Sequence, residues 1–209
     1  TKAVSINASN SAVALTFTGG SGGDTLTSGS GNDTLTGGSG NDVLSSGNGT
    51  NTITGGAGDN TLTGGTGVDT ITSGDGADTI DSAAGNDTIT SGGGNDTLTF
   101  DTDGDLNKND TVDAGAGTDA AAITISTALA DPFTLTNVEN LDMTITGAIT
   151  VDLSGVASLE RLDIENGTSA GVAVSNVPTG VTVRTFDADA SVDVDTVAGA
   201  TLTFDSQLD

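Results

Sequence analysis

Residues 19–99 consist of nine nonapeptides in unbroken succession: GGSGGDTLT, SGSGNDTLT, GGSGNDVLS, SGNGTNTIT, GGAGDNTLT, GGTGVDTIT, SGDGADTID, SAAGNDTIT and SGGGNDTLT. Position 6 of each unit is Asp or Asn, and position 8 is Leu or Ile. Glycines early in the unit permit the positive-φ backbone of a tight turn. The last three residues alternate polar, apolar and polar, as in a short strand with one inward side chain. One unit is therefore half a coil, and stacked 18-residue coils make two parallel sheets with the aliphatic side chains between them.

The regular repeat ends after Thr99. A five-residue insertion, FDTDG (100–104), precedes two weaker units, DLNKNDTVD (105–113) and AGAGTDAAA (114–122). Beyond them glycine becomes rarer and short alternating segments follow, in which VENLDM (138–143) recurs as LERLDI (159–164). We therefore expect a lead-in strand or cap at 1–18, a β-roll at 19–122, and a wider parallel β-helix with a period of about 21 residues at 123–209. A separate β-sandwich is the alternative for the last part.

The composition restricts the possible partners. The chain has 29 acidic residues, 26 of them Asp, against four basic ones, and its formal net charge is −25. Such a surface repels phosphates, which argues against nucleic acid and anionic membrane surfaces as partners. The sequence contains no run of 18 apolar residues, so we do not expect a membrane-spanning helix. No signal peptide is visible and the first residue is not Met, so we expect a processed chain or an excerpt of a longer one.

The repeat predicts a requirement for cations. Parallel coils stack about 4.8 Å apart, so aspartates of alternate units lie over one another. At an effective dielectric constant near 20, each such pair of carboxylates repels by roughly 3.5 kcal/mol. Calcium suits carboxylate and carbonyl oxygens in flexible geometry, whereas magnesium demands a stricter octahedron. Zinc prefers His or Cys, and the chain has neither. We therefore expect several Ca²⁺ ions between the coils.

The nonapeptides resemble the G-G-x-G-x-D-x-U-x units of RTX (repeats-in-toxin) proteins, closely over 19–99 and loosely over 105–122. The resemblance implies an all-β fold, a right-handed parallel β-roll with 18-residue coils, which here would continue into a wider parallel β-helix or β-solenoid. It also implies secretion, commonly by a type I system, and folding driven by extracellular calcium. The side-chain ligands it implies are those at position 6: Asp24, Asp33, Asp42, Asn51, Asn60, Asp69, Asp78, Asp87, Asp96, Asp110 and Asp119. The turn carbonyls it implies belong to Gly20, Gly22, Gly38, Gly40, Gly47, Gly49, Gly56, Gly58, Gly65, Gly67, Gly74, Gly76 and Gly93.

Two units carry Asn in place of Asp at position 6. Stacking of alternate units leaves the interfaces 42/60, 60/78, 33/51 and 51/69 with one carboxylate each. We expect weaker or vacant calcium sites there, with Asp59 as a candidate substitute ligand from the turn.

Catalysis is not expected. GTSAG (167–171) matches the nucleophile-elbow pattern, but a chain without His lacks the usual base for Ser169. The carboxylates Asp101, Asp103 and Asp105 occupy an inserted acidic loop without aromatic residues to stack a sugar. Calcium ligation or solvation is the better interpretation of that loop.

Three functions remain open. Glycine-rich nonapeptides followed by NVENLDM-like strands also resemble bacterial surface-layer (S-layer) proteins and RTX adhesins, which favours a structural module of the cell surface that self-associates. The alternative is the secretion and folding domain of a type I exported toxin or enzyme. A third candidate is ice binding, because one sheet carries outward Thr-x-Thr pairs that resemble the ice-binding faces of β-solenoids: Thr34, Thr36, Thr52, Thr54, Thr70, Thr72, Thr88 and Thr90.

Overall fold

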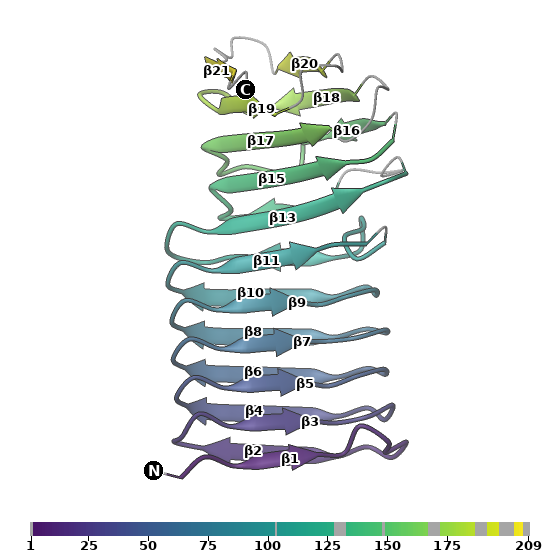
Figure 1. Cartoon of the computed structure of the whole chain (residues 1–209), viewed down its shortest axis with the longest axis vertical. Coiled ribbons are helices and arrows are strands. Elements are labelled where there is room, and N and C mark those ends of the chain that lie inside the picture. Colours follow the sequence, from purple (N-terminus) through teal and green to yellow (C-terminus); the bar gives the residue numbers. More distant parts are fainter. Residues whose placement is uncertain are drawn as a thin grey trace.

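The chain forms one parallel β-solenoid (Figure 1). The computed structural model describes residues 2–102, 104–127, 133–147, 149–166, 172–186, 192–196 and 203–206. Every strand pair between these residues is parallel, and each strand pairs with strands one coil away. In Figure 1 the chain rises from its N-terminus, running one way along the front sheet and back along the rear sheet, which gives a right-handed winding.

Sheet A runs through the whole solenoid in the order β1-β3-β5-β7-β9-β11-β13-β15-β17-β19-β21. Its strands are β1 Ser5–Asn7, β3 Thr25–Thr27, β5 Val43–Ser45, β7 Thr61–Thr63, β9 Thr79–Asp81, β11 Thr97–Phe100, β13 Ala120–Ile125, β15 Asn140–Ile145, β17 Arg161–Asn166, β19 Thr182–Thr185 and β21 Thr203–Ser206.

Sheet B faces it, in the order β14-β12-β10-β8-β6-β4-β2. Its strands are β2 Thr16–Gly20, β4 Thr34–Ser39, β6 Thr52–Ala57, β8 Thr70–Asp75, β10 Thr88–Gly93, β12 Thr111–Asp113 and β14 Leu135–Thr136. A third sheet joins β16 Thr150–Asp152, β18 Val172–Val177 and β20 Val192–Thr196.

The register follows the nonapeptide period and then widens. Thr25 pairs with Val43, which is the equivalent residue of the next unit but one. Thr97 pairs with Ala120, because the inserted residues bulge out of the turn and lengthen that coil. Farther on the register follows the looser repeat, since Asn140 of VENLDM pairs with Arg161 of LERLDI. The predicted β-roll that continues into a wider β-solenoid is confirmed, and the alternative of a separate β-sandwich is wrong, since sheet A passes without interruption from one part to the other.

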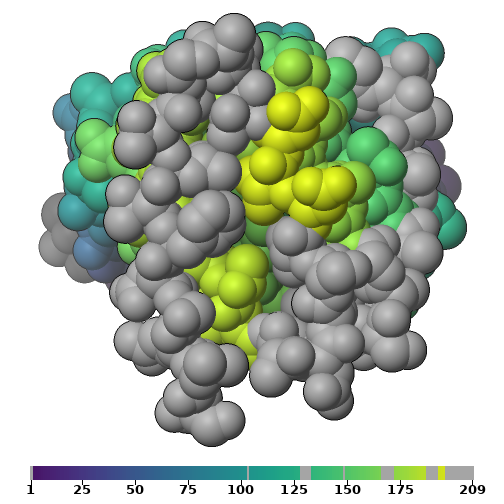
Figure 2. Space-filling model, turned by 90° about the horizontal axis from the view of Figure 1, so that it is seen from above, coloured from purple at the N-terminus to yellow at the C-terminus, as the bar shows by residue number. Residues whose placement is uncertain are grey.

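The core is one continuous cluster of buried, mainly aliphatic side chains from both sheets. Each of the nine position-8 residues, Leu26 to Leu98, is at most 1% exposed. Each contributes roughly 2–3 kcal/mol by burial. Phe100 continues strand β11 and is also buried, so the chain leaves the sheet only after it. Seen down the long axis from the C-terminal end, the described residues of the last coils lie over the preceding ones (Figure 2).

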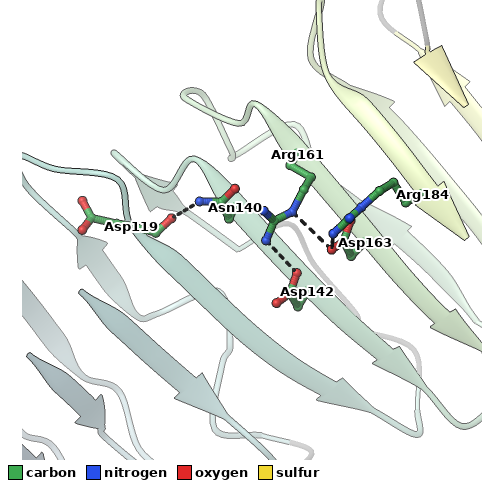
Figure 3. Close-up of polar contacts among 6 residues, drawn as sticks. All are labelled: Asp119, Asn140, Asp142, Arg161, Asp163 and Arg184. Carbon is green, nitrogen blue, oxygen red and sulfur yellow. Dashed lines mark hydrogen bonds and ion pairs between the residues drawn. The ribbon is translucent and has the colours of Figure 1, made fainter. Parts of the chain in front are cut away.

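Two of the four basic residues lie on the outer face of sheet A (Figure 3). Arg184 on β19 donates through Nε to Oδ1 of Asp163 on β17, at 2.6 Å, and its second nitrogen contacts Oδ2. Arg161 lies 3.2 Å from Asp163 Oδ2 and 3.6 Å from Asp142 Oδ1. These ion pairs connect β15, β17 and β19 across three coils. Within the described ranges, no helix is long and apolar enough to cross a membrane.

Candidate calcium site

The position-6 side chains form two rows, one at each edge of the solenoid. Turns that lead from sheet B into sheet A carry the first row: Asp24, Asp42, Asn60, Asp78, Asp96 and Asp119. Turns that lead from sheet A into sheet B carry the second row: Asp33, Asn51, Asp69, Asp87 and Asp110. All of these side chains are buried, although they belong to turns of largely small and polar residues.

One oxygen of each side chain belongs to the backbone network. Oδ1 of Asp42 accepts the N–H of Asp24 at 2.7 Å, and the same bond recurs along both rows at 2.7–3.0 Å. In the first coil the N–H groups of Val4 and Leu15 donate to Asp24 and Asp33 in the same way. Position 6 must therefore carry a side-chain acceptor of this length, and both Asp and Asn supply one.

The second carboxylate oxygen, Oδ2, distinguishes the aspartates at position 6 from the asparagines. Among the described residues, Oδ2 is buried and has no hydrogen-bond partner in eight of these aspartates: Asp24, Asp33, Asp42, Asp69, Asp78, Asp87, Asp96 and Asp119. A buried carboxylate oxygen without a partner is costly. A cation removes that cost by binding it.

Backbone carbonyls face the same oxygens. A Cβ built on Gly19 would lie 2.1 Å from Asp24 Oδ2 and 2.6 Å from the carbonyl oxygen of Gly37, one coil on. At Gly37 the corresponding distances, to Asp42 Oδ2 and to the oxygen of Gly55, are 2.2 and 2.7 Å. At Gly64 they are 2.6 Å to Asp69 Oδ2 and 2.7 Å to the oxygen of Ser82. Position 1 of these units thus leaves room beside an anionic oxygen and a carbonyl oxygen, which is the donor set that Ca²⁺ prefers.

The electrostatics also favour a cation. Burial raises the pKa of Asp69, Asp87 and Asp96 to about 6. The charge of the aspartates above and below raises the pKa further in Asp87 and Asp96, while hydrogen bonds from the neighbouring N–H groups lower it. Within the described part of the chain no three acidic side chains cluster as a metal site. Each turn contributes only one position-6 carboxylate to its row. A bound ion therefore needs the backbone carbonyls of the turns as further ligands.

The two asparagines have no unpartnered oxygen. Asn51 donates through Nδ2 to the carbonyl of Gly47 at 3.1 Å, and Asn60 donates to that of Gly58 at 2.8 Å. Asp59 is exposed, and its Oδ1 accepts the N–H of Ala77, so it does not face the turn of Asn60. Asn32, Asn41 and Asn95 make this same surface contact one coil on. The order Asp59-Asn60, in place of the Asn-Asp of neighbouring units, therefore keeps a side-chain oxygen that accepts a backbone N–H at both position 5 and position 6.

Asp110 differs from the other aspartates. Its Oδ1 accepts the N–H of Asp87, but its Oδ2 accepts the N–H of Asn107 at 2.6 Å. Asp105 is buried and bonds the N–H of Thr102 within the inserted loop. Asp105 and Asp110 thus hold the segment around the insertion together, whereas Asp101 is exposed. Asp103 and the GTSAG segment with Ser169 lie outside the described residues.

Two features of the site were missed by sequence reasoning. Glu139 extends the first row, because its Oε2 accepts the N–H of Asp119 at 2.8 Å, as an aspartate does in earlier coils. Carbonyls of position 1, those of Gly37, Gly55 and Ser82, also lie close to Oδ2, in addition to the carbonyls of positions 2 and 4 that the resemblance predicts as ligands. The signal for position 1 was present in the sequence, since only Gly or Ser occurs there in the nine regular units.

A family model describes the same segment. The RTX calcium-binding nonapeptide repeat matches four times, at residues 18–53, 45–80, 54–89 and 72–106. Residues 18–106 are an RTX repeat array. The RTX repeats are calcium-binding structural units, and the matched family is not an enzyme family, so Ca²⁺ is the ion of this β-roll. A search of curated proteins and a search of solved structures found no match.

Proposed function

We propose that the chain is a calcium-dependent structural module of a secreted bacterial cell-surface protein, an S-layer subunit or an RTX adhesin. Calcium bound by the two rows drives folding and makes the module rigid. The observation that carries the proposal is the set of eight buried, unpartnered Oδ2 atoms at the edges of the roll. Calcium modules of extracellular proteins bind at about 10⁻⁴–10⁻³ M, a concentration range that keeps such a chain unfolded inside the cell and folds it outside.

The shape of the solenoid supports a role in an assembly. Sheet A runs through the described coils as one sheet of eleven strands, and acidic side chains are also exposed on the surface of the roll. Calcium in excess of the internal sites therefore has exposed carboxylates, such as those of Asp59 and Asp75, to bridge between molecules. The net charge of −25 prevents such contacts when cations are absent.

Assembly is tested with the purified chain in calcium, in magnesium and in chelator. We expect sheets or fibres by electron microscopy in calcium only, and their dissolution after chelation. A chain that folds with calcium but stays monomeric at every calcium concentration would contradict the assembly role and favour the alternative, a secretion and folding domain.

Ice binding is a second candidate because the structure aligns the predicted threonines. Parallel pairing places Thr34, Thr52, Thr70 and Thr88 in one file and Thr36, Thr54, Thr72 and Thr90 in a second. Thr16 and Thr18 extend both files at one end, and Thr111 extends the first at the other. The hydroxyls thus repeat about every 4.8 Å on an outward face.

Thermal hysteresis of the calcium-loaded chain tests this candidate. We expect hysteresis that Thr52→Lys abolishes and that Thr61→Lys, on the exposed face of sheet A, leaves intact. If the calcium-loaded chain shows no thermal hysteresis, ice binding is excluded.

A further inference from the structure

The orientation of the two asparagine side chains is fixed by their surroundings. Oδ1 of Asn60 accepts the N–H of Asp42 at 3.0 Å, and Oδ1 of Asn51 accepts that of Asp33 at 2.9 Å. A backbone N–H only donates, so the amide oxygen must face it and Nδ2 must point into the turn. There each amide donates to a carbonyl of its own turn, that of Gly58 or Gly47.

The amide nitrogen occupies the place of the unpartnered aspartate oxygen. A Cβ on Gly37 would meet Asp42 Oδ2 and the oxygen of Gly55. A Cβ on Gly55, one coil on, would meet Asn60 Nδ2 at 2.9 Å and the oxygen of Ser73 at 2.6 Å. A pair of oxygens that attracts a cation is thus replaced by an N–H donor beside an oxygen, which repels one.

We propose that Asn51 and Asn60 are calcium-independent rungs, in which a side-chain amide bonds a carbonyl of its own turn at the place where the aspartate turns bind calcium. The two asparagines belong to consecutive units and so interrupt both rows at the same height of the solenoid. They separate an N-terminal calcium cluster from a C-terminal one. The N-terminal cluster contains Asp24, Asp33 and Asp42, and the C-terminal cluster contains Asp69, Asp78, Asp87, Asp96 and Asp119.

The arrangement has a physical consequence for assembly of the roll. An unbroken row would place every carboxylate between two others, whereas Asp42 and Asp78 in the first row face a neutral amide on one side, as do Asp33 and Asp69 in the second. The coil that joins the clusters is therefore complete without cations, and each cluster loads calcium on its own. This inference rests on the proposal that the Oδ2 atoms bind calcium.

Calcium stoichiometry of the full chain tests it, by equilibrium dialysis with the metal quantified by mass spectrometry. Asn60→Asp and Asn51→Asp each create one new Oδ2 beside a turn carbonyl, so we expect each to bind one Ca²⁺ more than the wild type, and the double variant two more. Asn41→Asp and Asn32→Asp are the matched controls. They add the same charge at exposed positions and keep the oxygen that accepts the N–H of Asp59 or Thr50, so their stoichiometry stays at the wild-type value.

The outcomes separate the two proposals. If the wild type binds calcium but Asn60→Asp and Asn51→Asp bind no more Ca²⁺ than it does, the proposal of calcium-independent rungs is overturned and the proposed function is not. A wild type that binds no calcium would overturn the proposed function. Nuclear magnetic resonance of the calcium-loaded wild type gives a readout that needs no variant to fold. We expect couplings across the hydrogen bonds from Nδ2 of Asn51 and Asn60 to the carbonyls of Gly47 and Gly58, and side-chain amides that exchange at the solvent rate would contradict the proposal.

Discussion

At the scale of single residues, one atom decides what each turn binds. Asp and Asn at position 6 accept the same backbone N–H through Oδ1, so either residue maintains the coil. The second atom is an unpartnered anionic oxygen in Asp42 and a donating nitrogen in Asn60. The same substitution on the surface, Asp59 for the usual Asn at position 5, changes no contact of this kind, because only one oxygen is used there.

Gly37→Ala is predicted to abolish one calcium site. The added Cβ would lie 2.2 Å from Asp42 Oδ2 and 2.7 Å from the oxygen of Gly55, in the space between the two oxygens. We expect one Ca²⁺ fewer and a loss of about 1–3 kcal/mol in the free energy of unfolding of the calcium-loaded chain. Ser91→Ala is the control, since position 1 already carries a Cβ there and its Oγ has no partner among the described residues. Equal calcium counts in Gly37→Ala and the wild type would refute the assignment of this site.

The calcium-free roll is predicted to gain stability in acid. Burial raises the pKa of Asp69, Asp87 and Asp96 to about 6 in the folded chain, against about 3.9 for an exposed Asp. A raised folded-state pKa means that the folded form binds the protons more tightly, so this contribution is complete below about pH 4 and is lost as the pH rises through 6. Circular dichroism in calcium-free buffer should therefore show more β-structure at pH 4.5 than at pH 7.5. A spectrum independent of pH over that range would argue against buried aspartates.

At the scale of strands, the sequence determines register where one position holds one kind of residue. Position 8 is aliphatic in all nine units, and the repeat of VENLDM as LERLDI likewise gives the pairing of Asn140 with Arg161. The repeat did not predict that Phe100 is part of a strand. By the nonapeptide period the insertion begins at Phe100, whereas in the structure strand β11 includes this residue. The hydrogen bonds donated by the side-chain amides of Asn51 and Asn60 were not predictable either. A sequence does not tell which end of an amide faces which neighbour.

The contact of Arg161, Asp163 and Arg184 joins β17, which carries the LERLDI repeat, to β19, and sequence analysis did not find it. Asp163→Ala would leave two guanidinium groups next to each other on sheet A without their shared carboxylate (Figure 3). We expect the calcium-loaded chain to lose about 1.5–3 kcal/mol in the free energy of unfolding by urea. Glu165→Ala, at an exposed position on the same strand, should change it by less than about 0.5 kcal/mol. Similar losses in both variants would show that the ion pairs contribute little.

At the scale of the whole molecule, two sheets share a core of aliphatic side chains, and two rows of buried carboxylates run along the edges of the roll. Each pair of charged neighbours opposes stacking by roughly 3.5 kcal/mol if the carboxylates lie about 4.8 Å apart at a dielectric constant near 20. Cations therefore decide whether the coils stack, and folding of the roll is coupled to binding. The coils beyond Asp119 pack a broader set of Val, Ile and Leu side chains, and among their described residues Glu139 continues the first row.

The central claim is that calcium builds the roll, and circular dichroism of the full chain at pH 7.5 during a calcium titration tests it most directly. We predict a spectrum dominated by coil in chelator, a cooperative change to β-structure on adding calcium, and no comparable change with the same concentration of magnesium. A β-spectrum that is already complete in chelator and unaltered by calcium would contradict the account.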